Sequence, residues 1–131
     1  MSNAAATPGI TGLGQVSIVV QNVERATAFY RDVLGLPLLF VFPGLAFFDC
    51  AGVRLMLSRA ETPELDHPSS ILYFRVPDIN TSHQRLVEQG VKIVEEPRLI
   101  APMATYDLWM SAFRDSEENI LQLMSEVPRS A

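Results

Sequence analysis

Residues 15–36 read QVSIVVQNVERATAFYRDVLGL, and this stretch decides the fold. In its first six residues, Val16, Ile18 and Val20 alternate with Gln15, Ser17 and Val19, at the period of two that the two faces of a β-strand require. Asn22 can then cap a helix, because its side-chain oxygen can accept an unpaired amide of the first turn. From Val23 to Leu34, apolar residues recur three and four positions apart, and Gly35 ends the helix in a conformation that glycine adopts without strain. The stretch predicts a strand, a short turn and an amphipathic helix.

The same plan recurs 56 residues later, where residues 71–91 read ILYFRVPDINTSHQRLVEQGV. Asn22 corresponds to Asp78, and Gly35 corresponds to Gly90 after a slip of one residue. After each helix, short apolar segments separated by turn residues predict three further strands. The chain is therefore predicted to be an α+β protein of two β-α-β-β-β modules rather than a long repeat array.

The length of 131 residues suits one globular domain with a buried core. We expect this domain to cover residues 12–126, with module one at 12–59, an exposed polar linker at 60–69 and module two at 70–126. Residues 1–11 are expected to be a flexible leader that resembles a cloning remnant, and residues 127–131 are expected to be a tail.

The net charge of −5 disfavours a nucleic-acid partner and an anionic membrane surface. No apolar run approaches the ~20 residues that a membrane-spanning helix needs. Cys50 is the only cysteine, so no intrachain disulfide can form, which fits a reducing compartment. We therefore expect a cytoplasmic protein that binds neither nucleic acid nor membrane.

Three motifs carry a resemblance to a known family. They are A-x-x-F-Y-x-x-V-L-G-L at residues 26–36, F-R-V-P-D-I at 74–79 and F-R-D-S-E-E-N-I-L-Q-L at 113–123. In this order they resemble the vicinal oxygen chelate superfamily, which includes glyoxalase I, extradiol dioxygenases, fosfomycin-resistance enzymes and bleomycin-resistance proteins. The resemblance implies a curved, cup-like mixed sheet of eight strands with two helices outside. It also implies a homodimer with cavities at or near the interface.

The metalloenzymes of this family bind a divalent ion with His or Glu side chains from four strands. The resemblance assigns the corresponding positions of this chain to Gln15, Leu55, Ile71 and Gln122. Aliphatic side chains have no lone pair to donate, and neutral amides do not neutralise the charge of the ion. A shift of the fourth strand by one residue would present Arg54 or Met56, and neither improves the site. We therefore expect no bound metal and no cofactor.

These positions suit an organic ligand better, because ligand pockets are mostly apolar with a few placed polar groups. Gln15 and Gln122 are predicted to orient the ligand; alternatively, they satisfy each other or nearby backbone groups. The aromatic candidates are Phe48, Tyr73 and Trp109, which line the pocket or, alternatively, pack beneath the helices. On the third strand, Phe47 is the alternative to Phe48. The neutral amides suggest an uncharged or weakly charged ligand. The predicted ligand-binding residues are Gln15, Phe48, Leu55, Ile71, Tyr73, Trp109 and Gln122.

Asp49 is the candidate catalytic residue, since a carboxylate in an otherwise apolar strand can act as a general base. Its position just before a turn supports a second interpretation, in which it caps the hairpin. His67 in the linker is a further acid–base candidate.

Three functions remain open. The main prediction is a metal-free small-molecule binding protein that holds an organic ligand in the cavity between the modules. It is similar to the bleomycin-resistance branch, whose members sequester a ligand without chemistry. The alternative is a glyoxalase-like lyase or isomerase with an atypical or absent metal site. The third is an interaction module whose cavity is filled by its own side chains.

Overall fold

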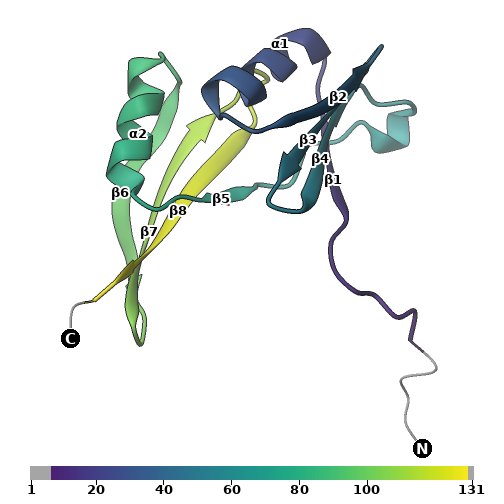
Figure 1. The fold of residues 1–131 in the computed structure, drawn as a ribbon. Coiled ribbons are helices and arrows are strands. Elements are labelled where there is room, and N and C mark those ends of the chain that lie inside the picture. The colour runs from purple at the N-terminus through teal and green to yellow at the C-terminus, as the bar shows by residue number, and fades with distance from the viewer. Residues whose placement is uncertain (1–6, 130–131) are drawn as a thin grey trace, which may run out of the picture.

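The computed structural model describes residues 7–129 of the chain. Residues 1–6 of the predicted leader and residues 130–131 of the predicted tail lie outside the described residues. The architecture is α+β, as predicted, with eight strands arranged in two four-stranded mixed sheets (Figure 1). Each sheet belongs to one module.

The first module has the predicted order of one strand, one helix and three strands. It comprises β1 (Gln15–Val19), α1 (Val23–Ala28), a π-helical segment (Phe29–Val33), β2 (Leu38–Phe42), β3 (Leu45–Cys50) and β4 (Val53–Ser58). The second module repeats this order after a connector that contains a short 3-10 helix (Pro63–Leu65). It comprises β5 (Tyr73–Arg75), α2 (Ile79–Glu88), β6 (Ile93–Pro102), β7 (Tyr106–Arg114) and β8 (Ile120–Pro128).

The helices begin where the sequence predicts. The side chain of Asn22 accepts the Arg25 amide at 2.9 Å, and the side chain of Asp78 accepts the Asn80 amide at 3.1 Å. Gly35 and Gly90 follow the helices with φ of +72° and +76°, in the left-handed region that glycine adopts most easily. The repeat seen in the sequence is therefore also a repeat of local geometry.

The first helix differs from its prediction in one respect. Instead of one continuous α-helix, α1 widens into a π-helical segment at Phe29–Val33, and the Leu34 amide donates to the Phe29 carbonyl at 3.1 Å. Such a bond spans one residue more than the bond of an α-helix.

The two sheets share one topology. Their strand orders are β1-β4-β3-β2, called sheet A here, and β5-β8-β7-β6, called sheet B. In each sheet the first and last strands of the module pair in parallel, and the other pairs are antiparallel. Equivalent bonds extend the two parallel pairs, from the Val20 amide to the Ser58 carbonyl and from the Val76 amide to the Met124 carbonyl, both at 2.9 Å.

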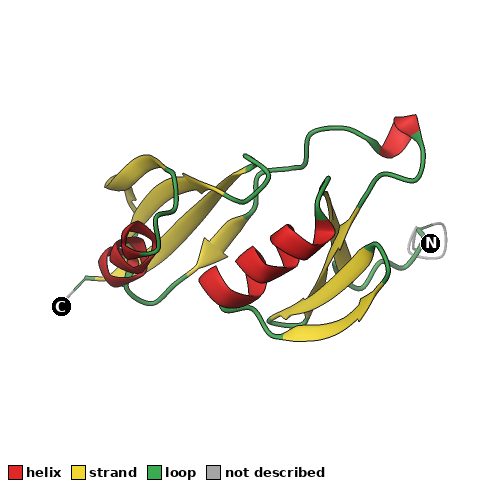
Figure 2. Ribbon diagram, turned by 90° about the horizontal axis from the view of Figure 1, so that it is seen from above, coloured by secondary structure: helices red, strands yellow, loops and turns green. Residues whose placement is uncertain are grey.

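Each helix covers one face of its own sheet. Helix α1 contacts β3 and β4, and α2 contacts β6, β7 and β8. Figure 1 shows both helices in the upper part of the view, and Figure 2 shows α1 drawn between the two sheets. The face of each sheet that points away from its helix is called its open face below.

A single hydrophobic core joins the two modules. Apolar residues that are almost fully buried in both of them belong to one cluster. The cluster comprises Ile18, Val20, Ala26, Tyr30, Ala46, Phe48, Leu55, Leu57, Ile79, Leu86, Phe113, Leu121 and Leu123. No helix within residues 7–129 has the length and hydropathy to cross a membrane.

Two boundaries differ from the sequence-based expectation. The segment PRLIAP at residues 97–102, bounded by two prolines, predicts a loop, but strand β6 includes it. This strand tolerates Pro97 and Pro102 because it is an edge strand, where a missing N–H does not break a central ladder. Strand β8 continues to Pro128 and so includes the first two residues of the expected tail.

Candidate ligand-binding site

The open face of sheet A brings together residues from all four strands. Alternation along each strand and the register between strands determine which side chains share this face. They are Gln15, Ser17 and Val19 of β1, Arg54, Met56 and Ser58 of β4, Leu45, Phe47 and Asp49 of β3, and Phe40 and Phe42 of β2.

Gln15 and Arg54 form the polar centre of this face. They are register partners in the parallel β1–β4 pair, and the Arg54 Nε atom donates to Gln15 Oε1 at 2.8 Å. The Gln15 Nε2 atom lies 3.7 Å from the Met56 sulfur, which is a weak acceptor. Among the described residues, Gln15 therefore bonds to side chains of its own sheet, rather than to Gln122 or to a backbone group.

The Arg54 guanidinium also stacks on an aromatic ring. Its central carbon lies 5.3 Å from the centroid of the Phe47 ring, within the range of a cation–π interaction. The Phe40 ring lies 4.7 Å from Phe47 and 5.4 Å from Phe42, measured between centroids. The open face of sheet A thus combines one fixed cation with a row of aromatic rings.

The structure corrects two predicted site residues in this module. Leu55 and Phe48 are 2% and 0% exposed, and they lie on the opposite face of sheet A, in the core beneath α1. The β4 residues that share the face of Gln15 are Arg54 and Met56. An error of one residue in strand register moves a side chain to the other face, which is why the sequence assignment failed here.

Asp49 lies at the end of the open face of sheet A, opposite Arg54 in the register of β3 and β4. Its Oδ1 atom accepts the Gly52 amide at 3.1 Å, in the turn between these strands. This bond matches the second interpretation of Asp49, as a cap of the hairpin.

The open face of sheet B holds the second predicted amide. Tyr73 and Gln122 are register partners in the parallel β5–β8 pair and so point to the same side. Ile71 lies two residues before β5 and is exposed. Within residues 7–129, no hydrogen bond joins Gln15 to Gln122, and the two residues belong to different sheets.

Trp109 does not share this face. It pairs with Ser125, which is almost fully buried and donates to the Pro77 carbonyl at 3.3 Å on the α2 side of sheet B. Trp109 packs against the hydrophobic core from this side. The alternative interpretation for the aromatic residues, packing beneath the helices, therefore applies to Trp109.

The connector forms part of a cavity that the sequence did not predict. This hollow of about 470 Å³ is lined on the sheet side by Ser17, Val19, Leu45, Met56 and Ser58, all on the open face of sheet A. On the connector side it is lined by Arg59, Ala60, Glu61, Leu65 and His67. The segment was expected to be an exposed linker because it is polar and lacks periodicity; Leu65, an apolar residue among acids, was the available signal.

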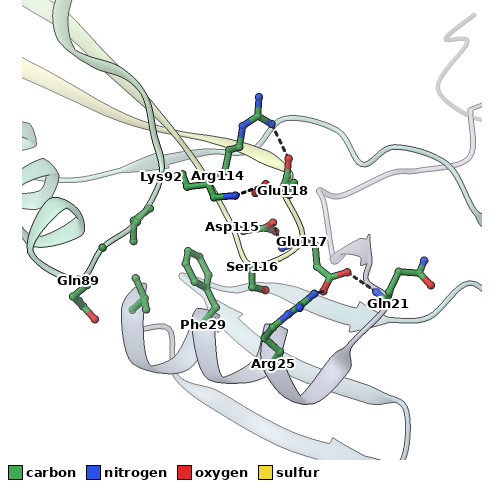
Figure 3. Close-up of a pocket in the computed structure, with 13 residues that line it drawn as sticks. Gln21, Arg25, Phe29, Gln89, Lys92, Arg114, Asp115, Ser116, Glu117 and Glu118 are labelled. Carbon is green, nitrogen blue, oxygen red and sulfur yellow. Dashed lines mark hydrogen bonds and ion pairs between the residues drawn. The ribbon is translucent and has the colours of Figure 1, made fainter.

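A second hollow lies where the modules meet, and Figure 3 shows its lining. Its charged side chains bond to one another: Arg25 pairs with Glu117 and Lys92 pairs with Glu118, both at 2.6 Å. The backbone amide of Gln21 also donates to Glu117 Oε1 at 2.6 Å. Because these groups are already paired, we assign this hollow to the joint between modules rather than to the ligand site.

Comparison with known proteins identifies the class of protein. Residues 12–123 match the family described as the Glyoxalase/Bleomycin resistance protein/Dioxygenase superfamily, so the chain belongs to this superfamily. The resemblance inferred from the three sequence motifs is thereby confirmed.

Individual relatives are similar to the chain at low sequence identity. The uncharacterized protein YraH of Bacillus subtilis (strain 168) is 24% identical over 123 residues, which cover 83% of this chain and 94% of YraH. A lactoylglutathione lyase from Agrobacterium tumefaciens has a TM-score of 0.72 at 20% identity, covering 89% of this chain and 95% of the lyase. TnmS3, an antibiotic binding protein from Streptomyces sp. CB03234, has a TM-score of 0.73 at 23% identity, covering 92% of this chain and 99% of TnmS3.

The residues at the metal-binding positions do not fit a divalent cation. On the face of Gln15, β4 presents Arg54 or Met56 in place of Leu55, beside Gln15, Ile71 and Gln122 at the other positions. Two neutral amides, an alkyl group and a guanidinium or thioether supply neither negative charge nor the imidazole and carboxylate ligands that such ions prefer. Within the described part of the chain, no three His, Cys, Asp or Glu side chains are grouped so that they could hold a metal ion.

Proposed function

We propose that this protein is a metal-free small-molecule binding protein of the glyoxalase/bleomycin-resistance type. The observation that carries the proposal is the open face of sheet A, where a row of aromatic rings lies beside hydrogen-bonding groups at Gln15 and Arg54. Mostly apolar surfaces with a few placed polar groups are typical of organic ligand sites. The fold that the chain shares with TnmS3, an antibiotic binding protein, supports the same class of function.

We further propose that the working form is a homodimer. The open faces and edge strands expose large apolar side chains, which isolated soluble chains rarely display in quantity. They include Leu39, Phe40, Val41, Phe42, Ile71, Tyr73, Leu99, Ile100 and Met103. A second copy that laid its sheet B across sheet A would cover this surface and enclose a cavity between Gln15 of one copy and Gln122 of the other.

A thermal-shift screen tests the proposal. Protein treated with EDTA is heated with a panel of small organic molecules, and a true ligand raises the free energy of unfolding by RT ln(1 + [L]/Kd). We expect some members of the panel to stabilise the protein in proportion to this expression. A panel without any effect would favour the interaction module whose cavity is filled by its own side chains.

Metal analysis of the same protein tests the metal-free part. We expect far less than one equivalent of zinc, nickel, manganese or iron per chain after purification without chelator. A stoichiometric transition metal that EDTA removes together with ligand binding would contradict the proposal.

The second candidate function is a glyoxalase-like lyase or isomerase with an atypical or absent metal site, and the position of His67 favours it. His67 lines the cavity over sheet A, and its Nδ1 atom lies 3.0 Å from the Pro68 carbonyl oxygen. A carbonyl only accepts hydrogen bonds, so Nδ1 is the donor in this contact, and in the neutral tautomer that fits it Nε2 is the acceptor.

Turnover separates the two functions. Each ligand from the screen is incubated with the protein and followed by NMR for cleavage or isomerisation. An enzyme that uses His67 would lose turnover in the His67→Asn variant and keep it in the His83→Asn control, whereas a binding protein returns every ligand unchanged. We expect every ligand to be returned unchanged. We also expect the protein to be located in the cytoplasm.

A further inference from the structure

We propose that Arg54 binds the carboxylate of a small planar aromatic ligand on the open face of sheet A, a proposal that rests on the small-molecule function above. The sequence suggested an uncharged or weakly charged ligand because only the two amides were assigned to the site. The corrected register adds a guanidinium beside Gln15 and so changes the expected ligand.

The first argument is the orientation of the guanidinium. Its Nε atom is already bonded to Gln15 Oε1 at 2.8 Å, which fixes the plane of the group relative to β1. The Phe47 ring lies on one side of this plane, 5.3 Å from the central carbon. The two terminal amino groups form no hydrogen bond with residues 7–129. Such a pair of parallel donors matches the two oxygens of a carboxylate.

The second argument is the missing counter-charge. Within the described part of the chain, no carboxylate lies within salt-bridge distance of Arg54. The acidic residue opposite it, Asp49, is bonded to the Gly52 amide instead. On the open face of sheet B, by contrast, Arg75 pairs with Glu126 at 3.3 Å and Arg98 pairs with Glu95 at 2.8 Å. Arg54 is thus left to attract an anion from outside the chain.

The third argument is the aromatic surface beside the cation. Phe40 and Phe47 lie with their centroids 4.7 Å apart, and Phe42 extends the row along β2. A flat conjugated ring can pack against these rings, and such contacts contribute beyond the buried area alone. A ligand that joins such a ring to a carboxylate would use the rings and the guanidinium together.

Paired probes test the proposal without knowledge of the natural ligand. Benzoate, 2-naphthoate and indole-3-acetate are titrated into the intact protein by calorimetry, each beside its neutral amide. We expect at least one carboxylate to bind about tenfold or more tightly than its amide, since a charge-assisted pair is stronger than a neutral hydrogen bond. We also expect the affinity to fall as salt is added, because the site is partly exposed.

Two variants assign the effect to Arg54. Arg54→Met keeps an apolar stem over Phe47 and removes the charge, so we expect it to lose the preference for the carboxylate. Arg31→Met removes the same charge from the π-helical segment that follows α1, where Arg31 is exposed and paired with Asp32 at 2.8 Å, and should leave affinity unchanged. Circular dichroism verifies that both variants remain folded, and Arg54→Lys, which keeps the charge, should retain part of the preference if Arg54→Met does not fold.

The outcomes separate this proposal from the function on which it rests. Equal affinity for acids and amides, or acid binding that Arg54→Met does not weaken, overturns the role of Arg54 while ligand binding stands. If Arg54→Met weakens self-association but not acid binding, Arg54 pairs with a second copy, and the proposal is wrong. If neither acids nor amides bind and no member of the thermal-shift panel stabilises the protein, the proposed function fails as well.

Discussion

The phenol of Tyr30 donates a 2.7 Å hydrogen bond to Oδ2 of Asp115, and this bond joins the first module to the second. Both residues are almost fully buried, at 0% and 4% exposure. Burial, together with the charge of Asp115, raises the pKa of the phenol far above its usual value, so Tyr30 remains a donor at all ordinary pH values. The Phe-Tyr pair of the helix motif therefore contributes a specific contact between modules as well as apolar area.

Tyr30→Phe should lower the free energy of unfolding by about 1–3 kcal/mol, because the buried Asp115 carboxylate loses one of its partners. Urea denaturation followed by circular dichroism measures the change. Tyr73→Phe removes an exposed hydroxyl in β5 and should leave stability nearly unchanged. Equal effects of the two variants would show that the bond between Tyr30 and Asp115 does not stabilise the junction.

Glu117 should make stability depend on pH. Burial alone would raise its pKa, but hydrogen bonds from the Gln21 amide and Arg25 outweigh this effect and hold the pKa below its usual value. A carboxylate with a lowered pKa in the folded state stabilises the protein above its unfolded pKa, about 4.3, and this contribution is lost as pH falls through the folded pKa.

Glu117→Gln should therefore cost about 1 kcal/mol or more at pH 7, and the difference from the native chain should shrink steadily below about pH 4. Urea titrations at a series of pH values measure it. Glu88→Gln, at an exposed position of α2, is the matched control and should show no such trend. A difference that stays constant down to strongly acidic pH would contradict the assignment.

Phe42→Glu should convert the proposed dimer to monomers. Phe42 is 53% exposed in the single chain, so the substitution leaves the core intact but places a charge in the surface that a second copy would cover. Sedimentation velocity at several concentrations measures the change. Val87→Glu, at a 43% exposed position of α2 in the second module, should leave the dimer unaffected. A native chain that sediments as a monomer throughout would refute the dimer.

Gln15→Ala and Gln122→Ala should each weaken a ligand found in the thermal-shift screen by about 1 kcal/mol, roughly fivefold, through the loss of a hydrogen bond. Calorimetric titration measures the affinities. For Gln15 the effect is partly indirect, because this residue orients Arg54. Gln84→Ala on α2 is the control. If both variants bind as tightly as the native chain, neither amide belongs to the site.

Local signals predicted the architecture well. The alternation of β1, the caps at Asn22 and Asp78 and the glycines at 35 and 90 act within a few residues, and each lies where the sequence indicated. The repeat of these signals was sufficient to predict two modules. Their topology was predicted from the order of the elements together with the family resemblance.

The direction of individual side chains was harder to predict. Leu55 was assigned to the ligand site, although the apolar set Val53, Leu55 and Leu57 already indicated which face of β4 meets the core. Trp109 was also assigned to the wrong face. Its strand has apolar residues on both faces, so the sequence pattern does not indicate which face meets the core. The sequence offered Arg54 only as the result of shifting the fourth strand by one residue, and the register of β1 and β4 places it beside Gln15.

The shared core has a practical consequence for the exposed connector between the modules. Because buried residues of both halves belong to one cluster, protease cleavage near Glu64 should sever the chain without separating the halves. We expect the two fragments to copurify, and to reassemble when expressed from separate plasmids. The fold would then serve as a split reporter, reconstituted by fragment complementation.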